Sequence, residues 1–235
     1  MIETILIPVG CIESHGLLPD DTDTLITKAF CMLASKKYGS ETAEALTHGF
    51  CPSTHWLPGT KGGFFEDVFR DFRGGAAKFI NSGRRYIVFV NIHSGNDAVL
   101  KAVVQDIFVR RAYPVMYFNP YTAFAGELDR KYFKGKDNNY KEISLLQASR
   151  GLLGLDAIKG PDKNQAQKRN LLVERLKKRS TVGFSYTEAA QHVAWRKGVD
   201  AAAGRKYLNK AVGRFGKALK DFKTYVDKTP GNKNG

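Results

Sequence analysis

The stretch Glu13-Ser-His-Gly-Leu-Leu-Pro-Asp-Asp-Thr-Asp23 follows a short apolar run, Ile5-Leu-Ile-Pro-Val-Gly10. An apolar run of this length that ends on a glycine turn is typical of a buried strand. Side chains alternate along an extended segment, so Glu13 and His15 are expected to point the same way. Carboxylates and an imidazole at the carboxyl end of a central strand suit a divalent metal ion. The alternative is a polar loop whose last residues only cap the next helix.

A second stretch has the same form. Arg84-Arg-Tyr-Ile-Val-Phe-Val-Asn-Ile-His-Ser-Gly-Asn96 contains an apolar strand, Tyr86 to Val90, which leads to His93 and a Gly-Asn turn. A helix is predicted to follow, from Ala98 to Val109. Two strands that each deliver a histidine before a helix place those histidines on one rim of an α/β sheet. A lone histidine there is usually packed and hydrogen-bonded, but two beside acids favour a metal site.

The motifs in these stretches resemble the creatininase (creatinine amidohydrolase) family, and they occur in the family's order. The matching segments are Glu13-x-His15-Gly16, Pro19, Thr22-Asp23, Pro58-Gly59-Thr60 and Asn91-x-His93-x-Gly95-Asn96. The resemblance implies a site for two divalent metal ions that hydrolyses C–N bonds of amides and cyclic amides. It also implies the metal ligands, with Asp23 as the bridge: Glu13, His15, Asp23, His93 and Glu142. Mixed imidazole and carboxylate ligands accept zinc, iron(II) or manganese.

Within the family, Asp21-Thr-Asp23 and Glu142-Ile-Ser144 look most like the archaeal formamide hydrolase of flavin and deazaflavin biosynthesis. That resemblance implies deformylation of a formylamino-pyrimidine ribosyl phosphate. One alternative is another creatininase-like hydrolase, acting on a cyclic amide or a peptide-type bond. A further alternative, from a different class, is a non-catalytic protein that binds nucleic acid or an acidic partner.

The chain departs from the family pattern ahead of its last expected ligand. The family usually has His-Ala-Gly there, whereas this chain has Asp137-Asn-Asn139. A carboxylate is ionised at neutral pH and is a poor proton donor to a leaving amine. His55, on a loop long enough to be functional, is the other candidate for that step. The expected catalytic residues are therefore His55 and Asp137, and the expected substrate contacts are Trp56, Thr60, Ser94 and Asn96.

Charge is distributed unevenly along the chain. The first 100 residues hold 9 Lys and Arg against 11 Asp and Glu, and the remaining residues hold 28 against 12. The basic part predicts an anionic partner, with a phosphorylated small molecule favoured over nucleic acid, although a solvated basic surface explains it equally well. Three cysteines without paired spacing, no signal-peptide pattern and no membrane-spanning apolar run predict a cytoplasmic protein.

With 235 residues and 43% hydrophobic content, the chain is expected to form one α/β domain with a mostly parallel sheet flanked by helices. The family resemblance implies a three-layer domain over residues 1–227 and assembly into a ring-like homo-oligomer. The residues after it, 228–235, are expected to form a disordered basic tail. The predicted local elements are helices at Leu25 to Lys37, Phe64 to Ile80, Ile143 to Leu153, Leu171 to Arg179 and Ala201 to Tyr225, a strand at Pro114 to Asn119, and a loop at Tyr121 to Asn139.

Overall fold

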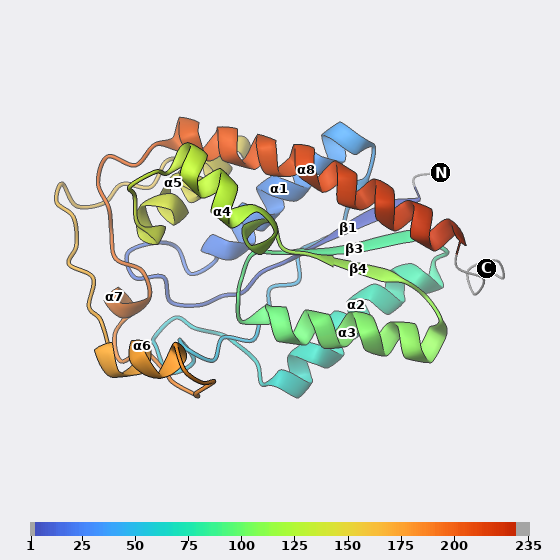
Figure 1. The fold of residues 1–235 in the computed structure, drawn as a ribbon, viewed down its shortest axis with the longest axis horizontal. Helices are drawn as coiled ribbons and strands as arrows, with labels where there is room; N and C mark the ends of the chain where they lie inside the picture. The colour runs from blue at the N-terminus through green and yellow to red at the C-terminus, as the bar shows by residue number, and fades with distance from the viewer. Residues whose placement is uncertain (1–2, 229–235) are drawn as a thin grey trace.

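A four-stranded parallel sheet forms the centre of the protein in the computed structural model, which describes residues 3–228 (Figure 1). Its strands are β1 (Thr4–Val9), β2 (Glu41–Thr42), β3 (Tyr86–Asn91) and β4 (Val115–Phe118), in the order β2-β1-β3-β4. All residues of β1 and β3 are buried, as expected for a parallel sheet covered on both faces. The mostly parallel sheet predicted from the two apolar runs is therefore confirmed.

Helices cover both faces of this sheet and complete three layers (Figure 1). One face carries α1 (Thr22–Tyr38), α4 (Pro120–Tyr132), α5 (Asn138–Leu152) and α8 (Ala201–Lys228), and the other carries α2 (Phe65–Asn81) and α3 (Asn96–Arg111). Successive strand residues point to opposite faces, so the sheet divides the core into two clusters. Leu6 and Val88 pack in the first cluster, whereas Ile5 and Ile87 pack in the second.

The carboxyl ends of the strands are crossed by a long connection, residues 153–200, with little regular structure. It contains two short helices, α6 (Leu171–Lys177) and α7 (Ala189–His192), and both lie at that end of the sheet (Figure 1). Helix α6 agrees with the predicted Leu171 to Arg179 helix, whereas α7 was not predicted. This connection is the segment that closes over the strand ends.

Two local predictions were wrong. The segment Tyr121 to Asn139, predicted as a loop, contains α4, which begins at Pro120 behind Asn119. The Asn119 side chain accepts hydrogen bonds from the backbone N–H groups of Tyr121 and Thr122, so an N-cap and a first-turn proline start the helix. Helix α5 begins well before its predicted start at Ile143, because the Asp137 side chain accepts a hydrogen bond from the N–H of Tyr140.

The apolar stripe of α8 is buried, which makes it part of the core: Leu208, Val212, Phe215, Leu219 and Phe222. Helix α8 lies close to α5 at Gly204, where an added Cβ would be 2.3 Å from the carbonyl oxygen of Ser144. This close approach holds α5 in place two residues after Glu142. Lys228 ends α8, and residues 229–235 of the predicted tail lie outside the described residues. None of the helices described is long and apolar enough to cross a bilayer.

Candidate metal centre

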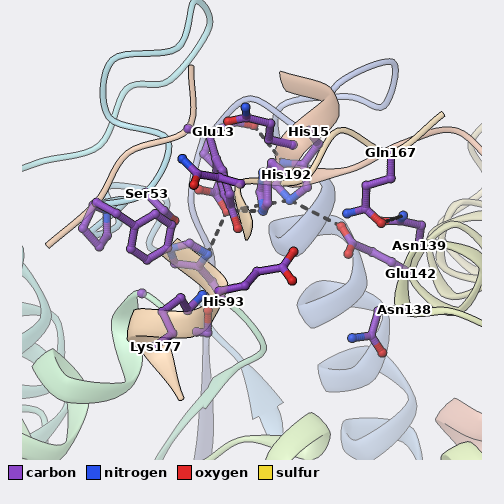
Figure 2. Close-up of a pocket in the computed structure, with 18 of the residues that line it drawn as sticks. Glu13, His15, Ser53, His93, Asn138, Asn139, Glu142, Gln167, Lys177 and His192 are labelled. Atoms are coloured by element: carbon purple, nitrogen blue, oxygen red, sulfur yellow. Dashed lines mark hydrogen bonds and ion pairs between the residues drawn. The ribbon is translucent and has the colours of Figure 1, made fainter. Parts of the chain in front are cut away.

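All five expected metal ligands lie at the carboxyl ends of β1 and β3. Glu13 and His15 follow β1, His93 follows β3, Asp23 is in the first turn of α1, and Glu142 projects from α5. They line a cavity of about 820 Å³, and Figure 2 shows the side chains of Glu13, His15, His93 and Glu142 directed toward one another at its floor. The fold therefore brings together residues that are up to 129 positions apart.

The ligand atoms form two groups. In the first, Nδ1 of His93 lies 2.9 Å from Oε1 of Glu13 and 2.9 Å from Oδ2 of Asp23. In the second, Nε2 of His15 lies 3.7 Å from Oδ2 of Asp23 and 3.6 Å from Oε1 of Glu142. Nε2 of His15 is also 3.8 Å from Oε1 of Glu13. Asp23 takes part in both groups, as a bridging ligand would.

The outer nitrogen of each imidazole is held by a backbone carbonyl. Nδ1 of His15 lies 2.8 Å from the Glu13 oxygen, and Nε2 of His93 lies 2.9 Å from the Phe50 oxygen. A carbonyl only accepts, so these nitrogens carry the hydrogen, and in a neutral ring the inner nitrogen presents a lone pair to the carboxylates. Lone pairs that face carboxylates repel them unless a cation lies between. Metal-binding histidines are oriented in this way.

The distances between these ligand atoms also fit metal ions. Ligands about 2.0–2.2 Å from an ion are separated from each other by about 3.0–3.6 Å, depending on the coordination angle. The separations within the two groups, 2.9 to 3.8 Å, bracket that range. The residues present therefore fit two divalent ions, one beside His93 and one beside His15.

The electrostatics of the buried cluster agree with this assignment. Burial alone would raise the pKa of Glu13, but His93 lowers it to about 2, and burial alone would lower the pKa of His15, but Asp23 and Glu142 raise it to about 10. The two imidazoles likewise hold the pKa of buried Asp23 well below its usual value. The pKa of His93 is raised well above its usual value against burial, chiefly by Glu13. In the absence of metal, the raised pKa values keep the rings of His15 and His93 protonated, so protons take the positions that metal ions would occupy.

Glu142 behaves differently from the other two acids. Burial raises the pKa of its carboxyl to about 7, and the opposing effect of His15 does not cancel this. A carboxyl with that pKa exchanges its proton near neutrality, so a bound cation ionises it readily. Glu142 is the acid of the cluster whose charge depends most on a nearby ion.

His192, from α7, joins the cluster although it was not predicted. Its Nδ1 lies 2.7 Å from the Ser14 oxygen, and its Nε2 lies 3.9 Å from Oε1 of Glu13. Its ring lies 4.8 Å from the His15 ring and stacks on Tyr186 at 5.6 Å, and Figure 2 shows the two histidines side by side. The connection that carries His192 has no periodic pattern that would single it out. The sequence signal was indirect: the histidine that the family usually has ahead of its last ligand is absent, because this chain has Asp137-Asn-Asn139 there.

The other expected catalytic residues lie away from the cluster. Asp137 lines the cavity wall, where it caps α5 and accepts a hydrogen bond from Nε of Arg196 at 2.7 Å. The His55 ring packs on Trp56 at 4.6 Å and on Phe64 at 5.7 Å. Neither His55 nor Trp56 is among the described residues that line the cavity, and Trp56 is 78% exposed.

The remaining expected substrate contacts are divided between cavity and scaffold. Ser94 lines the cavity beside His93. Thr60 accepts a hydrogen bond from the N–H of Ser14 at 3.0 Å, so it supports the loop that carries Glu13. Asn96 is buried, donates to the Gly10 oxygen and accepts from the N–H of Phe50. Asn96 therefore ties the β1 and β3 ends to the loop after Gly49.

Cations from the basic part of the chain line the cavity: Lys141, Lys168, Arg169 and Lys177. Lys168 lies 2.9 Å from Glu188, and Arg169 pairs with Glu174. The ammonium of Lys177 lies 4.5 Å from the centre of the Phe184 ring. Part of the uneven charge seen in the sequence thus lines the same cavity as the ligand cluster.

Residues 2–219 match the model of a protein family described as creatininase, creatinine amidohydrolase. A solved creatinine amidohydrolase (creatininase) has a TM-score of 0.72, with 16% identity over 93% of this chain and 90% of that chain. A zinc–zinc form of a mutant creatininase has a TM-score of 0.68, with 17% identity over the same shares, 93% and 90%. A manganese creatininase is also similar, with a TM-score of 0.67 and 16% identity over 93% and 90%.

Among curated proteins, the mycofactocin precursor peptide peptidase of Mycolicibacterium smegmatis is 32% identical over 114 residues. The match covers 44% of this chain and 44% of that relative, so it spans less than half of the relative's length.

Proposed function

The chain belongs to the creatininase family of metal-dependent amidohydrolases, and we propose from that premise that it hydrolyses the formamide bond of a formylamino-pyrimidine ribosyl phosphate. The carrying observation is the two-group ligand cluster at the floor of a cavity of about 820 Å³. The solved creatininases include zinc and manganese forms, and the imidazole and carboxylate donors here accept either metal. Iron(II) remains a third candidate on the same chemical grounds.

The chain's ligands divide between the two ions by their contacts. Glu13 and His93 would hold the first ion, His15 and Glu142 the second, and Asp23 both. When bound, such ions lower the pKa of a coordinated water to about 7 in favourable sites and polarise the carbonyl of the substrate. Thr54 donates a hydrogen bond to Oε2 of Glu13 at 2.5 Å, which leaves Oε1 directed toward His93.

His192 is the residue we propose for the proton transfer that the departing amine requires. Its Nδ1–H donates to the Ser14 oxygen, so Nε2 carries the lone pair and faces the cluster. Burial and the neighbouring charge of His15 lower the pKa of His192, which keeps the ring neutral at pH 7. A neutral Nε2 can accept a proton from the attacking water and return it to the leaving nitrogen. Since His55 lies outside the cavity lining, His192 is better placed for this step.

The cavity wall suits a polar heterocycle with an anionic group. Its volume falls in the range of about 300–1,000 Å³ typical of small-molecule sites. Nδ2 of Asn139 donates to Gln167 at 2.9 Å, and both amides line the wall, where they offer donors and acceptors to a pyrimidine. Lys177, which also lines the cavity, supplies positive charge for a phosphate. These features support a phosphorylated pyrimidine over uncharged creatinine.

The test is formate release by the protein loaded with zinc or manganese. We expect formate from the formylamino-pyrimidine ribosyl phosphate at a rate well above that of the metal-free protein, and little turnover of creatinine. The identity to a peptide peptidase favours one second candidate, a peptide-type bond. Cleavage of short peptides without formate release would move the substrate to that class while keeping the metal centre. No turnover, together with salt-sensitive binding of nucleic acid, would support the non-catalytic alternative.

A further inference from the structure

Two thiols lie behind the contact between Glu13 and His93. Cys11 and Cys51 each place a sulfur so that the four ligand atoms, two sulfurs, a carboxylate oxygen and an imidazole nitrogen, are all within 4.8 Å of one another. All four side chains are buried. Cys11 precedes Glu13 by two residues, and Cys51 follows Phe50, whose carbonyl accepts from His93. Both thiols are thus carried by the segments that position the ligands.

Two glycines make room for these thiols. A Cβ added at Gly49 would lie 2.7 Å from Cβ of Cys11, and a Cβ added at Gly62 would lie 2.8 Å from Cβ and 3.1 Å from Sγ of Cys51. Side-chain carbons do not approach this closely, so any larger residue at either glycine would displace a cysteine. The local backbone therefore passes close to both cysteine side chains and fixes where they lie.

The surroundings of this pair differ from those of an inert buried cysteine. A free cysteine usually serves as a small apolar side chain, as Cys31 of α1 does in the core. In contrast, Sγ of Cys11 donates to Oδ2 of Asp23 at 3.4 Å, and Sγ of Cys51 donates to the Gly49 oxygen at 3.6 Å. Cys11 thus contacts the carboxylate that both ligand groups share.

We propose that Cys11 and Cys51 bind the first metal ion as thiolates, together with Glu13, His93 and the shared carboxylate of Asp23, and make that position selective for zinc. The inference rests on the two-metal site proposed above. With zinc–sulfur bonds of about 2.3 Å, a sulfur and a neighbouring oxygen or nitrogen ligand are separated by about 3.2–3.6 Å. The 3.4 Å between Cys11 and Asp23 already has this value. Glu13 and His93 are already 2.9 Å apart, and the remaining pairs that include a sulfur, all within 4.8 Å, need movements of up to about 1 Å to close on an ion.

Thiolate ligands change which metal the position prefers. Soft sulfur donors favour zinc, whereas manganese favours oxygen donors. Each thiol that binds loses one proton to solvent as its metal–sulfur bond forms, and no oxidant or reductant is required. The first ion would therefore be zinc, while the second position, with imidazole and carboxylates only, accepts zinc or manganese.

Cobalt(II) reports thiolate ligation without any need for a substrate. Metal-free, reduced protein titrated with cobalt(II) should develop an intense near-ultraviolet charge-transfer band that is specific to cobalt–sulfur bonds. Cys11→Ser and Cys51→Ser should each weaken this band and lower the zinc-over-manganese affinity ratio about tenfold or more. Cys31→Ser is the matched control, because it removes a buried thiol of the core that belongs to none of the candidate ligand groups and should leave the band unchanged.

The outcomes separate this inference from the proposed function. Cobalt bound at two ions per chain with visible d–d bands but no charge-transfer band would overturn thiolate ligation and leave the two-metal site intact. Failure to bind cobalt at all would overturn both. If the serine variants do not fold, X-ray absorption of the zinc-loaded wild-type protein decides, since a sulfur shell at about 2.3 Å supports the inference and its absence refutes it.

Discussion

Removal of the Asp23 carboxylate should weaken both metal positions at once. Asp23 Oδ2 lies 2.9 Å from the ligand atom of His93 and 3.7 Å from that of His15, so it belongs to both groups. Glu142, in contrast, contacts only the His15 group, at 3.6 Å. Asp23→Ala is therefore expected to deplete two ions, and Glu142→Gln one.

The size of the effect follows from the number of ligands. Structural zinc sites bind with about 10–16 kcal/mol, and with four ligands each ligand corresponds to about 2.5–4 kcal/mol. At about 1.4 kcal/mol per factor of ten, loss of Asp23 should weaken each ion about 10²–10³-fold. The loss of its negative charge from the first turn of α1 costs about 0.3–1 kcal/mol of helix stability. Loss of its buried contacts with His15 and His93 costs about 3–5 kcal/mol more in the metal-free protein, so circular dichroism checks that the variant is folded before metal content is measured.

The assay is metal content after dialysis against a chelator of intermediate strength, measured by elemental analysis and checked by competition with a chromophoric chelator. Asp21→Ala is the matched control. Asp21 begins the same helix and makes no side-chain capping hydrogen bond, so its removal changes the charge equally and should leave both ions bound. Asp23→Ala protein that keeps both ions with affinities within about tenfold of wild type would refute the bridging assignment.

Three further predictions concern the other groups at the site. His192→Ala should lower kcat about 10²–10³-fold with metal content unchanged, and added imidazole should restore activity, whereas His55→Ala should have little effect. The reverse order would return proton transfer to the loop that carries His55. Metal binding at pH 7 should release protons into a weakly buffered solution, because His15 and His93 hold protons in the metal-free cluster. The pKa of His15 is raised to about 10, so metal affinity should rise with pH up to about that value. Binding without proton release would contradict this charge state. Lys177→Ala should raise KM for the phosphorylated substrate and weaken inhibition by free phosphate at unchanged kcat, and an unaltered salt dependence would exclude Lys177 as the phosphate contact.

Local sequence patterns were sufficient to predict the candidate ligands that directly follow a buried strand. The apolar runs before Glu13 and before His93 predict two buried strands, and both strands are present as β1 and β3. Parallel strands joined by right-handed crossovers bring their carboxyl ends to one edge of the sheet, so the two histidines had to meet there. The same reasoning could not place Glu142, which the family resemblance alone assigned.

Helix starts were predicted less well, because capping residues act over only a few positions. The region after Asn119 lacks a clear apolar period, and the cap formed by Asn119 and Pro120 determines that α4 begins there. Asp137 has the same role for α5, so the acid that stands where the family usually has a histidine serves as a helix cap in this chain. A residue that deviates from a family motif can thus be explained by backbone capping.

The sequence by itself determined the parallel sheet and the two strand ends that carry Glu13, His15 and His93, because these depend on hydrophobic period and chain order. Only the tertiary structure decided that His192 would lie against Glu13 and that Cys11 and Cys51 would meet behind it. His192 reaches the cluster through a hydrogen bond to Ser14, 178 residues away, within a connection that has no period of its own. Contacts between such distant segments are set by how the whole core packs, and no local pattern along the chain records them.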